Sequence, residues 1–410
     1  MPKPTFVIVG ASLAGAKAAE TLRAEGFDGR VVLVGSEAER PYERPPLSKE
    51  YLRAEAGREK IYVHGNTFYD DHDIELRLST PVTEVDASAR KLLLVGGESL
   101  SYERLLLTTG AAPRRLDIPG SDLDGVYYLR DVPDADLLRD RIHEGGRLVI
   151  IGAGWIGAEV AASARQKGAD VTVIVRAAVP LKHVLGPEVG AIYRDIHAQH
   201  GVEMLSQTEV AAFEGSRAVE RVRTDDGTTI DCDFVVAGVG VSPRTELAQV
   251  AGLEVDNGIV VDEFLETSIR DVFAAGDVAN PWHPFYGRRI RVEHWDNAIH
   301  QGRVAAKNML GQKVAYDRIP YFFSDQYDVG MEYSGYATKW DQVVFRGDTE
   351  SREFIAFWID AGRVVAAMNV NVWEVTDPLQ AMIRSQRPVD VDRLVDPDVP
   401  LTELAELPAS

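Results

Sequence analysis

Two segments of the chain place a short apolar run directly before a cluster of glycines. Residues 6–15 read FVIVGASLAG, and residues 148–157 read LVIIGAGWIG. Each run is aliphatic or aromatic over four residues, which predicts a buried strand. Alanine-rich helices and second aliphatic strands are predicted to follow each turn, with helices over 16–25 and 158–167 and strands over 31–34 and 171–175. Each segment therefore predicts a right-handed βαβ unit with a glycine turn.

The glycines of these turns have separate predicted tasks. Gly10 and Gly152 would make the tight turn, and Gly154 would let the backbone approach a pyrophosphate. Gly15 and Gly157 would allow the helix to pack closely on the strand. The pyrophosphate would then lie at the helix N-terminus, where free N–H groups and the helix dipole favour an anion.

The first copy departs from the dinucleotide pattern because Ser12 stands at the middle position. A single copy would also fit an ordinary glycine-rich turn between a strand and a helix. Two copies, with Gly152 following Gly10 by 142 residues, instead predict two dinucleotide sites. We expect one dinucleotide to be held tightly and the other to exchange.

The residues after the second strand of each unit distinguish the two sites. Ser36 and Glu37 follow the first of these strands, so Glu37 or Ser36 can bind an adenosine ribose. Arg176 follows the other strand and no acid is present there. An arginine can pair with a 2′-phosphate, which favours NADPH at the second site. The alternative is that Arg176 is a solvated residue of a loop.

Composition limits the function further. The chain has 410 residues, enough for two or three domains, and a net charge of -20, which disfavours binding to a broad phosphate backbone. Cys232 is the single cysteine, so the chain has no internal disulfide, no redox dithiol and no site built from cysteines alone, and no metal is expected. Neither a signal peptide nor a long apolar span is evident, which predicts a soluble cytoplasmic protein.

Further motifs connect the chain to a known family. Together with the two glycine segments it contains PYERPPLSK at 41–49, TTGA at 108–111, AAGD at 274–277, VEHWDNA at 292–298 and SDQY at 324–327. In this order the motifs resemble the FAD-dependent ferredoxin and rubredoxin reductases that serve bacterial oxygenases and cytochromes P450. The resemblance runs over essentially the whole chain, and PYERPPLSK with SDQY is its most specific part.

The resemblance implies an α/β fold with two Rossmann-like dinucleotide-binding domains, as in glutathione reductase, and a C-terminal α+β domain. The implied domains are a discontinuous FAD-binding domain at 1–109 and 235–317, an NAD(P)H-binding domain at 110–234 and the C-terminal domain at 318–410. Glycine- and proline-bearing stretches at 110–115 and 237–243 are expected to be the connections between the two nucleotide domains.

The resemblance also assigns cofactor contacts. Asp277 would accept a hydrogen bond from the FAD ribitol, the alternative being a plain Gly-Asp turn. The FAD contacts are Gly10, Ser12, Leu13, Ala14, Gly15, Ser36, Glu37, Arg44, Lys49, Val82, Thr109, Gly110, Arg130, Gly276, Asp277 and Trp295. The NAD(P)H contacts are Gly152, Gly154, Trp155, Ile156, Gly157, Glu159, Arg176 and Gly240.

Three of these residues would serve catalysis. By resemblance Lys49 lies beside the flavin ring and faces Glu159, and a lysine there would stabilise the negative charge of reduced flavin. A purely structural salt bridge is the alternative for this pair. Trp155 stands where the family carries a tyrosine that covers the flavin until nicotinamide displaces it. The larger indole puts the geometry of that gate in doubt.

The acceptor of the electrons follows from the lone cysteine. The disulfide reductases of this superfamily relay electrons through cysteines near the flavin, and Cys232 is expected in the strand that enters a domain connection. Electrons should therefore pass directly to a one-electron carrier, a 2Fe–2S ferredoxin or rubredoxin. Such carriers are acidic, so we expect a local basic patch, with Arg288, Arg289, Arg291 and Arg303 as candidates beside Lys339. The alternative is that these residues are solvated charges.

Two other functions share this scaffold. An NAD(P)H oxidase or diaphorase would deliver electrons to oxygen or quinones. A flavoprotein similar to apoptosis-inducing factor would bind partners or DNA and use NADH as a conformational switch, which a charge of -20 disfavours.

Overall fold

The computed structural model describes residues 3–406, and these form two compact units that are each built from separate stretches of chain. The first unit comprises the described residues up to Arg44, Arg58–Ala112 and Val241–Arg318. The second comprises Pro45–Gly57, Pro113–Gly240 and the described residues from Ile319 onwards. A short segment that includes Lys49 thus belongs to the second unit, although the chain on both sides of it belongs to the first.

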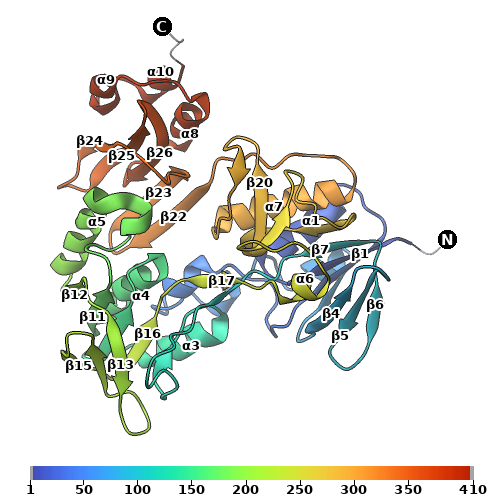
Figure 1. The fold of residues 1–410 in the computed structure, drawn as a ribbon, viewed down its shortest axis with the longest axis horizontal. Helices are drawn as coiled ribbons and strands as arrows, with labels where there is room; N and C mark the ends of the chain where they lie inside the picture. Colours follow the sequence, from blue (N-terminus) through green and yellow to red (C-terminus); the bar gives the residue numbers. More distant parts are fainter. Residues whose placement is uncertain (1–2, 407–410) are drawn as a thin grey trace. The chain divides into compact units, whose positions relative to one another are not determined.

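A five-stranded parallel sheet forms the centre of the first unit. Its strands, in spatial order, are β19 (Val272–Ala274), β7 (Arg104–Leu107), β1 (Thr5–Val9), β2 (Arg30–Val34) and β3 (Ile74–Arg77). The central strands are buried almost end to end, as expected for a parallel sheet covered on both faces. Helices α1 (Leu13–Ala24) and α7 (Trp295–Met309) lie side by side in this unit (Figure 1).

Gly302 of α7 makes the close contact with α1 possible, because a Cβ atom there would lie 2.4 Å from the carbonyl oxygen of Ala14.

Smaller elements complete the first unit. They are the sheet of β4 (Val82–Asp86), β5 (Lys91–Leu94) and β6 (Ser99–Ser101), the sheet of β18 (Ile259–Val261), β20 (Ala279–His283) and β21 (Arg288–Arg289), and the short helices α2 (Phe68–Asp71), α6 (Glu246–Val250), η2 (Arg58–Lys60) and η3 (Gly276–Val278).

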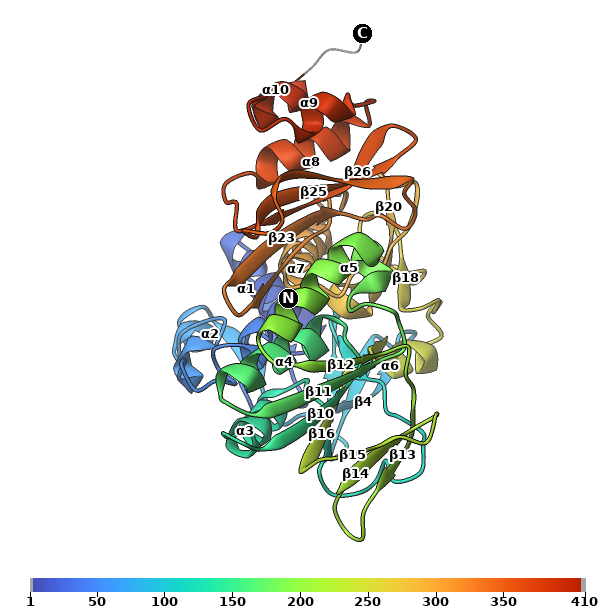
Figure 2. The same cartoon turned by 90° about the vertical axis from the view of Figure 1, so that its left-hand side faces the viewer.

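The second unit repeats the parallel arrangement. Its sheet has the spatial order β12 (Glu203–Ser206), β11 (Asp170–Val175), β10 (Arg147–Ile151), β16 (Phe234–Ala237) and β9 (Val126–Tyr127), and Figure 2 shows the first four strands side by side. Helices α3 (Val132–Arg141), α4 (Trp155–Gln166) and α5 (Lys182–Gln199) and the 3-10 helix η1 (Pro45–Ser48) accompany the sheet. A small antiparallel sheet contains β13 (Val210–Glu214), β14 (Arg221–Thr224) and β15 (Thr229–Asp231).

An antiparallel sheet near the C-terminus also belongs to the second unit. Its spatial order is β22 (Tyr321–Gln326), β23 (Val329–Gly335), β26 (Arg363–Val370), β25 (Glu353–Asp360) and β24 (Gln342–Asp348), followed by α8 (Thr376–Ser385), α9 (Val391–Val395) and α10 (Leu401–Glu406). Trp358 is fully buried and its indole N–H donates to the carbonyl of Leu185, 3.2 Å away on α5. The core of this sheet therefore includes residues of α5.

The two parallel sheets and the antiparallel C-terminal sheet confirm the fold class expected from the sequence. Both helices that follow the glycine turns begin three residues before the predicted starts, at Leu13 and Trp155. They can do so because the N–H groups of a first helical turn need no partner within the helix, so the small residues Ser12 and Gly154 can stand at the N-cap directly after the turn.

The predicted connections also have regular structure. β8 (Ala111–Pro113) and β17 (Val241–Pro243) pair with each other, and Arg244 donates its N–H to the carbonyl of Gly110 at 2.9 Å. Cys232 was expected in a strand that enters a connection; instead it lies between β15 and β16 and is buried. Among residues 3–406 we find no helix with the length and apolar character needed to cross a bilayer.

Candidate functional site

The first unit gathers predicted FAD residues at one edge of its parallel sheet. Gly10 follows β1, Glu37 follows β2, Thr109 follows β7 and Asp277 follows β19. These are the carboxyl ends of neighbouring strands of one parallel sheet, in the order β19, β7, β1 and β2. Such an edge is where dinucleotides bind in open α/β sheets.

Gly10 and Gly15 are required by the close packing of this turn. Gly10 has φ +121, and a Cβ atom there would lie 2.2 Å from the carbonyl oxygen of Thr108. A Cβ atom on Gly15 would lie 2.2 Å from the carbonyl oxygen of Gly10. Ser12 is the N-cap of α1, and its side chain makes no capping hydrogen bond. The first turn of α1 therefore keeps N–H groups for an anion, and Leu13 and Ala14 supply part of that turn.

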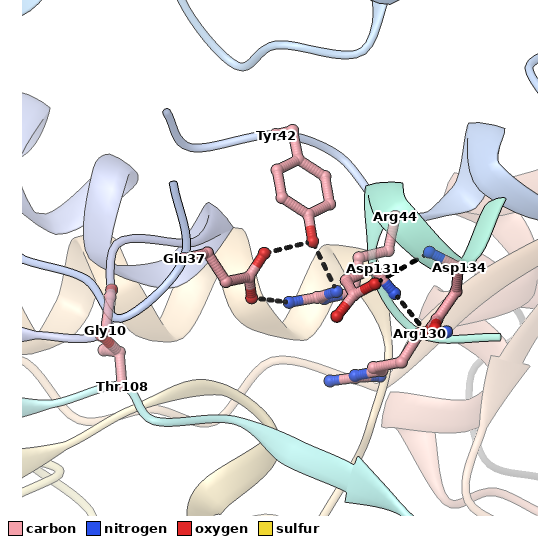
Figure 3. A network of polar contacts seen from close by, with 8 residues as sticks. All are labelled: Gly10, Glu37, Tyr42, Arg44, Thr108, Arg130, Asp131 and Asp134. Atoms are coloured by element: carbon pink, nitrogen blue, oxygen red, sulfur yellow. Dashed lines mark hydrogen bonds and ion pairs between the residues drawn. The ribbon is translucent and has the colours of Figure 1, made fainter. Parts of the chain in front are cut away.

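Glu37 is held by two neighbouring side chains (Figure 3). The hydroxyl of Tyr42 donates to Oε2 of Glu37 at 2.6 Å, and Nη2 of Arg44 lies 3.2 Å from Oε1. Nη1 of Arg44 donates to the Tyr42 hydroxyl at 3.0 Å. The adjacent Ser36 is exposed. This network fixes the carboxylate while leaving lone pairs that could accept hydrogen bonds from ribose hydroxyls.

Three further predicted FAD residues of the first unit, Gly276, Asp277 and Trp295, lie at the end of β19 and the start of α7. Gly276 donates its N–H to Oε1 of Gln301 at 2.9 Å, and the carbonyl of Asp277 accepts from Nη1 of Arg291 at 3.1 Å. Trp295 begins α7, after His294 at the N-cap, and burial lowers the pKa of His294 to about 4. This histidine is therefore neutral at physiological pH.

The remaining predicted FAD residues are Val82, Thr109, Gly110, Lys49 and Arg130. Val82 begins β4, and the Thr109 hydroxyl donates to the carbonyl of Arg244 at 2.7 Å, beside Gly110. Lys49 and Arg130 belong to the second unit. Arg130 precedes helix α3 and donates its backbone N–H to Asp134, whose carboxylate takes part in the capping box shown in Figure 3.

The second unit contains the other glycine turn. Gly152 has φ +96, and a Cβ atom on Gly157 would lie 2.1 Å from the carbonyl oxygen of Gly152. A Cβ atom on Gly154, by contrast, would meet no protein atom within 4 Å, and Ile156 is exposed next to it. Gly240 lies after the neighbouring strand β16. The surface at Gly154 is thus open to a ligand that approaches the helix N-terminus.

Arg176 is an exposed residue that already has a partner. Its Nε lies 2.8 Å from Oε1 of Glu209. The Arg176 guanidinium is thus ion-paired with a carboxylate that comes from outside the segment that follows β11. Glu209 stands 33 residues later in the sequence and was not part of the sequence prediction.

Lys49 and Glu159 form a buried ion pair, as the resemblance implied. The Nζ of Lys49 lies 2.9 Å from Oε2 of Glu159, and their side chains are 7% and 5% exposed. Glu159 also accepts hydrogen bonds from the hydroxyl of Ser48 at 2.5 Å and from that of Ser324 at 2.7 Å. Lys49 donates a further bond to the carbonyl of Pro45 at 3.1 Å.

The segment that carries Lys49 is fixed within the second unit. The hydroxyl of Tyr51 donates to Oδ1 of Asp136 on α3 at 2.6 Å, and that of Ser163 on α4 donates to the carbonyl of Ser48 at 2.6 Å. Leu52 is fully buried in the hydrophobic core beside the parallel sheet of the second unit. Trp155 packs edge-on against Phe322, with 4.7 Å between ring centroids, and lies near Tyr193.

Sequence reasoning assigned no role to four residues of these sites: Tyr42, Ser48, Gln301 and Ser324. Tyr42 and Ser48 belong to PYERPPLSK and Ser324 begins SDQY, so both motifs signalled the importance of the residues but not their partners. Gln301 lies on α7 outside any quoted motif. Nothing in the local sequence indicates that its amide binds the backbone of Gly276.

The predicted basic residues differ in their surroundings. Arg288 and Arg289 form the exposed strand β21, and Arg303 is exposed on α7. Arg291 is only 9% exposed and is ion-paired with Glu293. Lys339, in the second unit, lies 3.3 Å from a carboxylate oxygen of Asp360.

Known proteins resemble the chain over nearly its full length. The model of the family "Pyridine nucleotide-disulphide oxidoreductase" matches residues 4–302, and the model "Reductase C-terminal" matches residues 321–405. Rhodocoxin reductase of Rhodococcus erythropolis is 37% identical over 97% of this chain and 93% of its own length. The ferredoxin–NAD(+) reductase component of the anthranilate 1,2-dioxygenase system of Burkholderia cepacia is 40% identical over 98% of this chain and 99% of its own.

The fold gives the same answer. The crystal structure of the covalent putidaredoxin reductase–putidaredoxin complex contains a chain that superposes with a TM-score of 0.94 at 37% identity and 98% coverage of both chains. The relatives found by sequence and by fold thus agree with the two glycine turns, which we call the first cradle (Gly10 to Gly15) and the second cradle (Gly152 to Gly157). The chain belongs to the pyridine nucleotide-disulphide oxidoreductase family and, within it, to the ferredoxin and rubredoxin reductases.

Proposed function

We propose that this chain oxidises reduced nicotinamide dinucleotide at its second cradle, holds FAD at its first and delivers electrons to a 2Fe–2S ferredoxin that serves a cytochrome P450 or a Rieske oxygenase. The observation that carries the proposal is the pair of cradles in a chain with one cysteine. Burial raises the pKa of the Cys232 thiol to about 12, so it is not a redox nucleophile. A soluble carrier is therefore the fitting acceptor, as the relatives' names also indicate.

The residues of the first unit fit an FAD molecule. The open first turn of α1 would bind the pyrophosphate, Glu37 would bind the adenosine ribose and Asp277 would accept a hydrogen bond from the ribitol. When bound, FAD accepts two electrons as a hydride and can release them one at a time, which suits it to connect nicotinamide with iron–sulfur carriers.

The Lys49–Glu159 pair would serve the same reaction. Glu159 orients the Lys49 ammonium and neutralises the cost of burying it. A fixed ammonium beside the flavin would favour the reduced, negatively charged form. Trp155 would cover the flavin until nicotinamide displaces it, the role that the resemblance implies for the tyrosine of the family.

The function is tested by coupling. The purified flavoprotein is mixed with NADH or NADPH, a purified 2Fe–2S ferredoxin and cytochrome c, and the reduction of cytochrome c is followed. We expect fast, stoichiometric reduction that needs the ferredoxin, and slow oxygen consumption without it. Equal oxygen or quinone reduction without ferredoxin would instead support the alternative, an NAD(P)H oxidase or diaphorase.

The nicotinamide site is tested by Gly154→Val. The added side chain meets no protein atom within 4 Å of its Cβ position, so the fold and the bound FAD should be retained. The methyl groups would occupy the place of the pyrophosphate, and we expect KM for the nicotinamide to rise at least about tenfold, the effect of losing ~1.4 kcal/mol of binding. Gly57→Ala, also in open space in the second unit, is the matched control and should leave KM unchanged.

We propose NADH as the preferred donor. The expectation of NADPH is not supported, because relatives of this chain are named NAD(+) reductases and because Glu209 already pairs with Arg176. A carboxylate there neutralises the arginine and would repel a 2′-phosphate. We expect kcat/KM to be higher for NADH, and Glu209→Gln to raise kcat/KM for NADPH selectively. A wild-type preference for NADPH would contradict this.

We propose that Arg288, Arg289 and Arg303 attract the acidic ferredoxin. All three are exposed residues of the first unit, whereas Arg291 is largely buried and paired. Arg303→Glu should lower ferredoxin-dependent cytochrome c reduction about threefold to tenfold at low salt and have little effect at high salt. Arg217→Glu makes the same charge change at an exposed site of the second unit and is the control. A rate of ferredoxin-dependent cytochrome c reduction that does not change with ionic strength would contradict a role for these arginines in docking.

A further inference from the structure

The motif at residues 324–327 has no part in either dinucleotide cradle, yet its residues are unusually placed. Ser324 and Gln326 point into the interior of the second unit, and each is 1% exposed. The intervening Asp325 is exposed, as the alternation of a strand requires. Two polar side chains buried in succession on one face of β22 need partners, because an unpaired buried polar group is costly.

The partners form one continuous chain of hydrogen bonds. The hydroxyl of Ser324 donates to Oε1 of Glu159 at 2.7 Å, and Nε2 of Gln326 donates to the oxygen of Ser324 at 3.3 Å. Oε1 of Gln326 lies 2.9 Å from Nε2 of His197, a buried residue of α5. The other ring nitrogen of His197, Nδ1, lies 3.2 Å from the hydroxyl of Tyr327.

The direction of each bond follows from the donors available. Burial lowers the pKa of His197 to about 4, so its ring is neutral and carries one N–H. The oxygen of Gln326 can only accept, so Nε2 of His197 is the protonated nitrogen and Nδ1 accepts from the hydroxyl of Tyr327. Every donor from Tyr327 to Ser324 then points toward Glu159.

The outer end of the chain lies at an open surface cleft of the second unit. Its lining residues are Gln166, Gln199, His200, Tyr327, Asp328 and Arg352. The ring of Tyr327 stacks on that of His200 with 3.6 Å between centroids, which holds the phenol in place. The chain thus runs from an anchored surface residue to the buried carboxylate.

We propose that Tyr327, His197, Gln326 and Ser324 are positioning residues that fix the carboxylate of Glu159, and through it the ammonium of Lys49. Glu159 comes from α4, Lys49 from the segment after η1, Ser324 from β22 and His197 from α5, so four separate parts of the second unit determine one side-chain orientation. The positioning of Glu159 and Lys49 does not depend on the proposed function, whereas the effect of that positioning on flavin reduction rests on it.

The direction of the hydrogen bonds from Tyr327 to Glu159 is tested first, in the intact flavoprotein. Histidine labelled with ¹⁵N is incorporated, the ring spectra of the nine histidines are recorded, and His197→Gln assigns the signal. We expect a neutral ring protonated at Nε2 from pH 8 down to about 5. A ring protonated at Nδ1, or at both nitrogens at pH 7, would mean that Gln326 does not direct Ser324 toward Glu159, and it would overturn the proposal.

The effect on the reaction is tested with two changes of one residue. Gln326→Leu removes both hydrogen bonds, and Gln326→Glu introduces a carboxylate that competes with Glu159 for the hydroxyl of Ser324. We expect the rate constant of flavin reduction at saturating NADH to fall about tenfold in both, with KM unchanged, since the hydroxyl of Ser324 is no longer directed toward the charged Glu159. Ser324→Ala should behave alike and replaces these variants if they do not fold.

Gln199→Leu is the matched control. It makes the same change two residues from His197, on the same helix and in the surface cleft. Gln199 takes no part in the hydrogen bonds that connect Tyr327 with Glu159. We expect its rate and its His197 signal to equal those of the wild type. Wild-type rates in Gln326→Leu and Ser324→Ala would overturn the positioning role. If instead no nicotinamide reduces the wild-type flavin, the proposed function fails, while the ring spectra still decide whether the chain has the inferred direction.

Discussion

Replacing Glu159 by glutamine should destabilise the second unit by about 3–5 kcal/mol, the usual cost of removing one partner of a buried ion pair. Glutamine keeps the volume of the side chain but removes its charge. The carboxylate accepts from Lys49, Ser48 and Ser324, all of which donate. The amide offers one oxygen to these donors and turns an NH₂ group toward the others, so the Lys49 ammonium remains buried without a counter-charge.

The same reasoning predicts the outcome of removing both charges. In the double variant Lys49→Met with Glu159→Leu, no charge remains to be buried, and such replacements are often close to neutral. The hydroxyls of Ser48 and Ser324 lose an acceptor, each at about 1 kcal/mol. Ser48 retains the carbonyl of Pro45 at 3.3 Å, and Ser324 still accepts from Gln326. We therefore expect the double variant to lie within about 2 kcal/mol of the wild type.

The measurement is equilibrium urea unfolding at a fixed concentration of FAD, because bound ligand adds to stability. Tryptophan fluorescence reports on the second unit through Trp358, which is fully buried. Glu209→Gln is the control, since its pair with Arg176 is 52% and 79% exposed and should contribute at most about 1 kcal/mol.

Two results would refute the reasoning. The first is a loss in Glu159→Gln no larger than that in Glu209→Gln. The second is a double variant whose loss equals the sum of the losses of Lys49→Met and Glu159→Leu measured singly, because the ion pair would then contribute no coupling energy.

Three further predictions concern other parts of the chain. Gly10→Ala should reduce both FAD occupancy and stability, by at least about 2 kcal/mol, because its Cβ atom would lie 2.2 Å from the carbonyl oxygen of Thr108; Gly26→Ala, also at positive φ but in open space, should cost only about 1 kcal/mol in thermal unfolding and keep FAD. Cys232, with its pKa raised to about 12 by burial, should not react with a thiol reagent in the native protein at pH 8 and should react once after denaturation; fast native labelling would contradict its burial. Burial lowers the pKa of His197 to about 4, so as the pH falls below 6.5 this histidine takes up a proton in the unfolded chain before it does in the native protein. The free energy of unfolding should therefore decrease by about 2 kcal/mol between pH 7 and pH 5 because of this group. His197→Gln should remove that part of the pH dependence when the free energy is measured by urea unfolding.

Local sequence determined the parts of this protein that depend on local geometry. A glycine that must adopt positive φ, followed by a small residue and an alanine-rich run, specifies a strand, a turn and a helix within about 20 residues. The two cradles could be predicted for this reason, and so could the placement of Glu37 after its strand. The single cysteine likewise excluded dithiol chemistry from the count alone.

The tertiary structure decided the partners. Ser48 and Ser324 lie 111 and 165 residues from Glu159 in sequence, and Glu209 lies 33 residues from Arg176. No local pattern encodes such distances, so the sequence alone indicated NADPH, whereas the ion pair of Arg176 with Glu209 supports our proposal of NADH. The fold also places Lys49 in the second unit through contacts of Ser48, Tyr51 and Leu52. Backbone conformation is fixed by neighbours along the chain, whereas the pairing of buried charges and hydroxyls is fixed by packing between distant segments.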